Sequence, residues 1–203
     1  MTALDPSAPA DPALRATVRT VAFSNLGFFA IEFTVAATIG SVALSADSID
    51  FLEDASVNLL ILLALRWSLR ARARVGMALA GILLVPALTT LWTAWTKLAD
   101  PRPPDVAALS LTGAGALLVN LICALMLARF RAHGGSLARA AFLSARNDVV
   151  SNAAIIAAAL VTARLWPSAW PDLIVGLAIA AVNADAAREV FRAAREEHRA
   201  ATP

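Results

Sequence analysis

Four acidic residues fall within one largely apolar stretch near the start of the chain: Asp47, Asp50, Glu53 and Asp54. In a helix, Asp50 and Asp54 stack on one face with their side chains about 6 Å apart. Two carboxylates at that distance repel each other, and either a shared proton or a bound cation relieves the repulsion. Both solutions are typical of a site that carries ions across a membrane.

A third acid, Asp148, lies in a separate apolar stretch. Counted from opposite helix ends, Asp54 is expected about 16 Å deep and Asp148 about 15 Å deep, so the two meet at one level. Ser144 is four residues before Asp148 and shares its helical face, while Asn147 and Asn152 are expected to add amide oxygens nearby. This oxygen-rich set suits hard or borderline divalent ions, and it lacks the thiolates that copper(I) prefers.

The remaining acids have alternative interpretations. Asp47 is either part of the ion site or an acid that stays hydrated at the start of its helix, where it favours the helix dipole. Glu32 is expected about 10 Å from the outer end of its helix, near the level of Asp50. It is either an accessory carboxylate or proton carrier, or a hydrogen-bonded structural acid. Glu53 points about 60° away from Asp50 and is expected to flank the site.

The composition indicates that a bilayer surrounds these residues. Hydrophobic residues make up 59% of the 203-residue chain, whereas a soluble domain usually holds about 45 to 50%. The apolar stretches are each close to the roughly 20 residues that a spanning helix needs, and breaks such as Gly40-Ser41 and Trp166-Pro167 separate them. The sequence therefore predicts an all-α membrane protein with six transmembrane helices, at residues 18–39, 43–65, 75–96, 106–128, 138–163 and 170–188.

The arginines predict the orientation of these helices. They cluster after the second and fourth spans and at both ends of the chain, whereas the other side carries only Lys97, Arg102 and Arg164. By the positive-inside rule, both termini are expected in the cytoplasm. The chain is then expected to divide into a disordered tail at residues 1–17, a transmembrane domain at residues 18–190 and a short tail at residues 191–203, with no soluble C-terminal domain.

Several function classes are not expected. The single cysteine, Cys123, allows neither an intramolecular disulfide nor a cysteine-based metal cluster. The basic residues lie beside apolar spans, so membrane topology explains them and no nucleic-acid partner is needed. The lipid bilayer is the expected surrounding, and no enzymatic activity is predicted.

Two stretches resemble the metal-binding motifs of the cation diffusion facilitator family. They are Asp47-Ser-Ile-Asp50-Phe-Leu-Glu-Asp54, followed by Asn58, and Ser144-Ala-Arg-Asn-Asp148-Val-Val-Ser-Asn. The family's pattern is His or Asp, three residues, then Asp in the second span, with the same spacing in the fifth. The resemblance covers about residues 18–190.

The resemblance implies a transporter that exchanges cytoplasmic divalent metal for protons, with a tetrahedral site between the second and fifth spans. Carried over position by position, Asp50, Asp54 and Asp148 match three of the family's ligands. Ser144 stands at the fourth position, where family members usually have His or Asp. The resemblance further implies a homodimer in a bacterial inner (plasma) membrane, with the metal as substrate and no cofactor.

The departures from the family pattern bear on which ion is carried. A hydroxyl such as that of Ser144 is a poor zinc ligand compared with imidazole. Manganese, iron and cobalt therefore become stronger candidates for the transported ion, beside zinc and cadmium. Without a C-terminal domain, a dimer would have to form through membrane surfaces. His133, alone in its loop, is expected to be a surface residue rather than a ligand.

Two other functions stay open. One is a ligand-poor paralogue of these transporters that binds metal or partners without moving ions, and it is motivated by Ser144. The other is a metal-dependent intramembrane transferase with acids on two spans. That class has Gly and Ala-Arg at set offsets after its first acids, whereas Phe51 follows Asp50 here.

Overall fold

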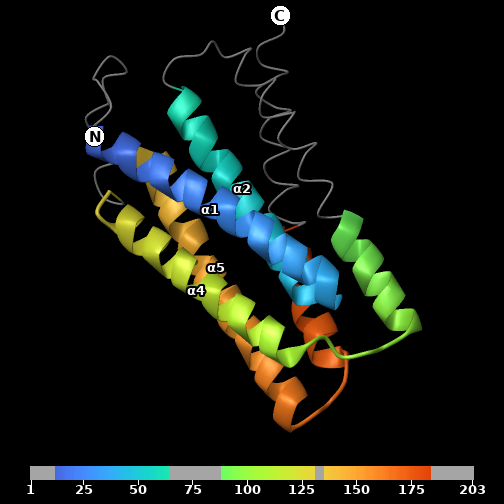
Figure 1. Cartoon of the computed structure of the whole chain (residues 1–203). Helices are drawn as coiled ribbons and strands as arrows, with labels where there is room; N and C mark the ends of the chain where they lie inside the picture. The colour runs from blue at the N-terminus through green and yellow to red at the C-terminus, as the bar shows by residue number, and fades with distance from the viewer. Residues whose placement is uncertain (1–11, 65–87, 131–134, 184–203) are drawn as a thin grey trace, which may run out of the picture.

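The computed structural model describes residues 12–64, 88–130 and 135–183. Within these ranges the regular structure is helical, with no strand. Four long helices carry the labels of Figure 1, and shorter helices cover residues 88–99 and 170–183. The long helices are α1 (Pro12–Ile39), α2 (Val42–Ala64), α4 (Val106–Ala128) and α5 (Gly135–Arg164).

The helix boundaries follow the chain breaks that the sequence predicts. α1 ends at Gly40, whose φ of 64° lies in the left-handed region that glycine adopts without strain. α2 begins directly afterwards, and the Ser41 hydroxyl accepts a 3.1 Å hydrogen bond from the Leu44 amide as an N-cap. Asp105 caps α4 in the same way, accepting a 2.7 Å bond from the Ala108 amide.

The start of the first helix differs from the prediction. α1 begins at Pro12, so residues 12–17 are helical although the sequence predicted a disordered tail through residue 17. Proline is favoured in the first turn of a helix, and the alanine, leucine and arginine that follow have high helix propensity. Of the third predicted span, 75–96, only the part from residue 88 is described, and its helix continues to residue 99.

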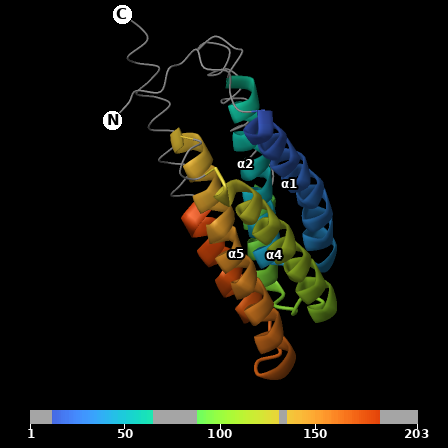
Figure 2. The ribbon, with the colours of Figure 1, turned by 90° about the vertical axis from the view of Figure 1, so that its left-hand side faces the viewer.

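The four long helices form a ring. α1 lies beside α2 and α4, and α5 lies beside α4 and α2, as the two views of Figures 1 and 2 show. Close contacts hold α4 in place: a Cβ on Gly113 would lie 3.2 Å from Ile155, and one on Gly115 would lie 3.1 Å from Phe28. These glycines allow close helix packing.

The surface of the bundle is more apolar than that of a soluble protein, and several polar side chains lie in its interior. Large apolar side chains face outward, among them Leu111 (77% exposed) and Val182 (70%). Polar and charged side chains are buried between the helices, among them Asn25, Glu32 and Asp54. Because lipid solvates apolar groups and leaves polar ones unsatisfied, this arrangement is the one that a bilayer favours.

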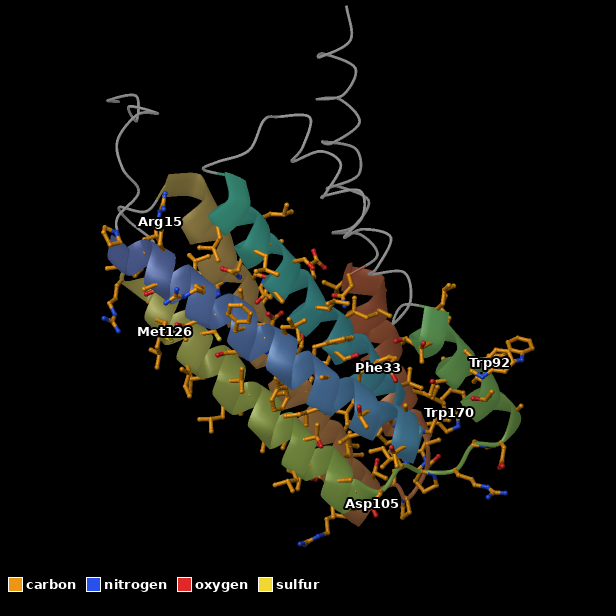
Figure 3. The ribbon with its side chains drawn as sticks, turned by 45° about the horizontal axis from the view of Figure 1, so that its top comes forward. Arg15, Phe33, Trp92, Asp105, Met126 and Trp170 are labelled. Carbon is orange, nitrogen blue, oxygen red and sulfur yellow. The ribbon has the colours of Figure 1, made fainter. Side chains whose placement is uncertain are left out.

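Length and composition agree with this polarity. Among the described helices, α1 and α4 are long and apolar enough to cross a membrane, and Trp170–Asn183 is a shorter apolar helix. α2 is also long, but it carries the acids of the candidate site. Trp92 and Trp170 are exposed and project near the end of the bundle that carries the Gly40 turn, as Figure 3 shows. We call this end the Gly40 end.

Candidate metal centre

Asp54 on α2 is the point where three long helices meet. Its Oδ1 accepts a 2.8 Å hydrogen bond from the Ser144 hydroxyl on α5, and its Oδ2 accepts a 3.3 Å bond from the Asn25 amide on α1. The carboxylate is buried, with 5% of the residue exposed. Two side chains that the sequence assigned to one site, 90 residues apart, are therefore in direct contact.

Asp148 lies one helical turn from Ser144 on α5 and is also buried. Its carboxyl group is within electrostatic reach of both Asp54 and Asp50. Asp50 lies one turn along α2 from Asp54, towards the Gly40 end, and is partly buried. The four candidate residues therefore occupy facing turns of α2 and α5.

These carboxylates do not form a closed coordination shell. Across residues 12–64, 88–130 and 135–183, no group of three or more His, Cys, Asp or Glu side chains converges closely enough to hold a metal ion. The donor chemistry still fits a divalent cation, because carboxylate and hydroxyl oxygens are the ligands that hard and borderline ions accept.

A chain of polar contacts extends from Asp54 to α4. The side-chain oxygen Oδ1 of Asn25 accepts a 3.6 Å hydrogen bond from the Cys123 thiol, so a line of contacts runs from Cys123 through Asn25 and Asp54 to Ser144. Asn25 on α1 is thus a buried polar group that joins α2 and α4. Its contact with Asp54 gives it a further role, since it orients a candidate ligand.

Glu32 on α1 and Asp47 on α2 form a second acidic pair nearer the Gly40 end. Both are 0% exposed, and their carboxyl groups lie close enough to interact directly, with the Asn152 side chain beside Asp47. The interpretation of Asp47 as a hydrated acid is therefore wrong. Glu32 lies against Asp47, which agrees both with an accessory carboxylate or proton carrier and with a hydrogen-bonded structural acid.

The sequence predicted the positions of some polar residues around these acids correctly and those of others wrongly. Asn147 was expected near the site, but it is exposed because it lies on the other face of α5. Asn152 is buried, and its amide donates a 2.7 Å hydrogen bond to the Asp148 carbonyl oxygen rather than to the carboxylate. Glu53 is partly buried beside the site, as predicted, and Arg146 is exposed. His133 lies outside the described residues.

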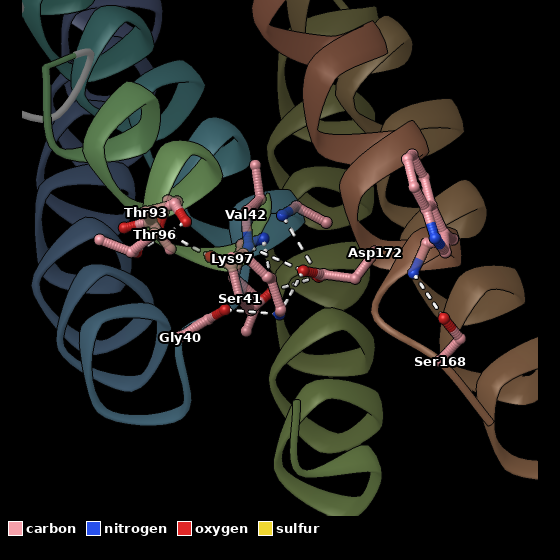
Figure 4. Close-up of polar contacts among 12 residues, drawn as sticks. Gly40, Ser41, Val42, Thr93, Thr96, Lys97, Ser168 and Asp172 are labelled. Atoms are coloured by element: carbon pink, nitrogen blue, oxygen red, sulfur yellow. Dashed lines mark hydrogen bonds and ion pairs between the residues drawn. The ribbon is translucent and has the colours of Figure 1, made fainter. Parts of the chain in front are cut away.

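A charged pair at the Gly40 end was missed by the sequence reasoning. Lys97 had been counted among the few charges on the outer side, yet it is 7% exposed and its Nζ lies 2.9 Å from Oδ2 of Asp172, which is 0% exposed (Figure 4). Asp172 also accepts hydrogen bonds from the first amides of α2, so this residue, and not Asp47, compensates that helix end. The only sequence signal was a lysine and an aspartate within otherwise apolar helices.

The comparisons with known proteins agree with this architecture. Residues 18–197 match the family described as the cation efflux transmembrane domain. A comparison with curated protein sequences gave no match. The helical bundle with an apolar surface and enclosed acidic residues agrees with this match. Because the match covers most of the chain, the protein belongs to the cation efflux, or cation diffusion facilitator, family of membrane transporters.

Proposed function

We propose that this protein exports divalent metal ions from the cytoplasm in exchange for protons, through a site formed by Asp50, Asp54 and Asp148 with Ser144 at the fourth position. The observation that supports this most strongly is the hydrogen bond between Ser144 and Asp54, because it joins the two helices that carry the candidate ligands. Membership of the cation efflux family supports the class of substrate.

The proposed exchange follows from the chemistry of carboxylates. A carboxylate must be deprotonated to bind a metal, so an ion arriving from the cytoplasm displaces protons, and protons from the other side later displace the ion. The buried pair of Glu32 and Asp47 lies between this site and the Gly40 end. In this proposal it carries protons or offers accessory oxygens as the ion leaves.

The proposed setting is a bacterial inner membrane that six helices span, with both termini in the cytoplasm and the Gly40 end outside. The arginine distribution supports that direction. The exposed tryptophans Trp92 and Trp170 fit a position at the outer interface, where amphipathic rings are enriched. We propose that the protein forms a homodimer.

The oxygen-rich donor set bears on the ion. Ser144 places a neutral hydroxyl where an imidazole would favour zinc, so manganese, iron or cobalt are proposed ahead of zinc and cadmium. The ion is the transported substrate rather than a resident cofactor.

The test is metal flux into proteoliposomes that hold the wild type or Asp148→Asn. The amide cannot replace a carboxylate's charge, so we expect the initial rate at low metal concentration to fall by about tenfold or more. Asp105→Asn is the matched control, because Asp105 caps α4 at the surface and asparagine also serves as a cap. Equal flux in all three proteins would overturn the site. Absence of flux for every divalent ion, including in the wild type, would favour the non-transporting paralogue.

A further inference from the structure

The buried charges at the Gly40 end form a complete hydrogen-bond network. Oδ1 of Asp172 accepts bonds from the Ser41 hydroxyl (2.6 Å) and the Ala43 amide (3.3 Å), and Oδ2 accepts bonds from the Val42 amide (2.9 Å) and Lys97 Nζ (2.9 Å). Lys97 Nζ also donates a 2.6 Å bond to the Gly40 carbonyl oxygen. Figure 4 shows these contacts converging on Asp172.

This network joins three parts of the chain that are distant in sequence. Lys97 comes from the 88–99 helix, Asp172 from the 170–183 helix, and Gly40 belongs to the turn between α1 and α2. An apolar cluster surrounds the network and draws on the same elements, with Val42, Ala94, Ala169 and Leu173 as its buried members. The start of α2 is therefore tied to both short helices.

The contact between α2 and the 170–183 helix leaves no room for a path. A Cβ on Gly176 would lie 2.6 Å from the backbone of Val42 and of Ala43, closer than real side chains pack. Asp50 follows Val42 by eight residues, which corresponds to about 12 Å of helix rise. The network and this contact thus join α2 tightly to the 170–183 helix between the candidate metal site and the Gly40 end.

A buried ion pair of this kind has two stable arrangements, one in which the charges are paired and one in which both are hydrated. Inside an apolar end, either charge alone is strongly unfavourable, so Lys97 and Asp172 separate only if water or other groups reach both. The neighbouring pair of Arg102 and Asp100 differs, because its side chains are 85% and 63% exposed and water already screens them.

We propose that the Lys97–Asp172 ion pair is the outer latch of the transporter. While it is closed, it holds the start of α2 against the 170–183 helix and bars the carboxylate site from the outside. Release of an ion outward requires the pair to separate. The role in ion release rests on the proposed function, whereas the closure itself can be measured without any transport.

The experiment reports outer accessibility with one engineered thiol. Ser45→Cys, in a Cys123→Ser background, places it one turn below Ser41, at a residue that is 1% exposed. An impermeant maleimide is added from the outside to right-side-out vesicles. Lys97→Met removes one charge of the latch, and we expect the labelling rate to rise by about tenfold or more as the population shifts towards the open state. Arg102→Met is the matched control and should leave the rate unchanged.

Two additions separate opening of the latch from loss of the fold. The native thiol of Cys123 is buried five residues before the C-terminal end of α4. It serves as a reporter in a protein that keeps Ser45, and we expect its labelling to stay slow in Lys97→Met. If Lys97→Met does not fold, the double variant Lys97→Met/Asp172→Asn replaces it, because that protein has no unpaired buried charge. The labelling rate of the double variant then shows whether the ion pair controls access from the outside.

The outcomes are distinct for the latch and for transport. Faster labelling at position 45 with a slow Cys123 supports the latch, whether or not metal flux is measurable. Unchanged labelling at position 45 in the folded variants overturns the latch even if the wild type transports metal. Equal acceleration at both thiols also overturns it, because that result means that the pair only stabilises the fold.

Discussion

The Ser144 hydroxyl on α5 donates a 2.8 Å hydrogen bond to Oδ1 of Asp54 on α2. This contact sets the two candidate motifs at the same level of the bundle. It also engages a carboxylate oxygen that a metal ion would use, so Ser144 either becomes a ligand itself or turns away when an ion binds. Both possibilities make position 144 important for the choice of ion.

Ser144→His is expected to shift the selectivity towards zinc. An imidazole supplies a borderline nitrogen ligand at the fourth position, and zinc favours such a ligand over a hydroxyl. The measurement is the ratio of zinc to manganese flux in proteoliposomes, which we expect to rise by about tenfold, a difference of about 1.4 kcal/mol in relative binding. Asp105→Asn, at the exposed start of α4, is the control and should leave the ratio near that of the wild type. An unchanged ratio in Ser144→His would place residue 144 outside the site.

The proposed exchange predicts the direction of the pH effect. Protonated carboxylates release metal, so acid on the outer side promotes release, and acid on the cytoplasmic side opposes loading. In vesicles with the cytoplasmic face outward, a lumen that is more acidic than the bath should raise metal uptake several-fold, and the reversed gradient should lower it. Collapse of the gradient with a protonophore is the control. Metal uptake rates that are the same with either direction of the pH gradient would contradict proton coupling.

Gly176→Ala is expected to destabilise the protein, because its Cβ would lie 2.6 Å from the α2 backbone, which cannot move aside as a flexible side chain would. Overpacking of this kind costs about 1 to 3 kcal/mol. Gly27→Ala is the matched control, since nothing lies within 4 Å of its added Cβ and alanine favours a helix more than glycine does. Thermal unfolding in detergent should show a lower midpoint for Gly176→Ala and an equal or higher one for Gly27→Ala. The opposite order would disprove the tight contact.

Helical spacing and depth were sufficient to predict the contact between α2 and α5. The positions of Asp54 and Ser144 along their own helices follow from the regular rise, and both helices have ends that glycine and proline mark in the sequence. The same reasoning failed for Asn147, because its distance along the chain suggested proximity while the helix turns it outward.

The charge network at the Gly40 end could not be predicted in this way. Lys97 and Asp172 are 75 residues apart, and whether two charges meet depends on how separate helices pack rather than on the period of either helix. The positive-inside rule counts Lys97 as an exposed outer charge, whereas tertiary packing pairs it with Asp172 and buries both. The enclosure of Asp47 has the same origin, since packing of several helices around the start of α2 is not visible in the α2 sequence.

The most direct test of the central claim is a double-mutant cycle on metal affinity with Asp54→Asn and Asp148→Asn. Calorimetric titration of the purified protein with manganese gives the affinity of the wild type, both single variants and the double variant. If both carboxylates bind one ion, each single change should weaken binding by about tenfold or more, and the double change should weaken it by clearly less than the product, with a coupling of at least about 0.5 kcal/mol. Losses that simply add, or an affinity that neither substitution changes, would contradict a shared site between α2 and α5.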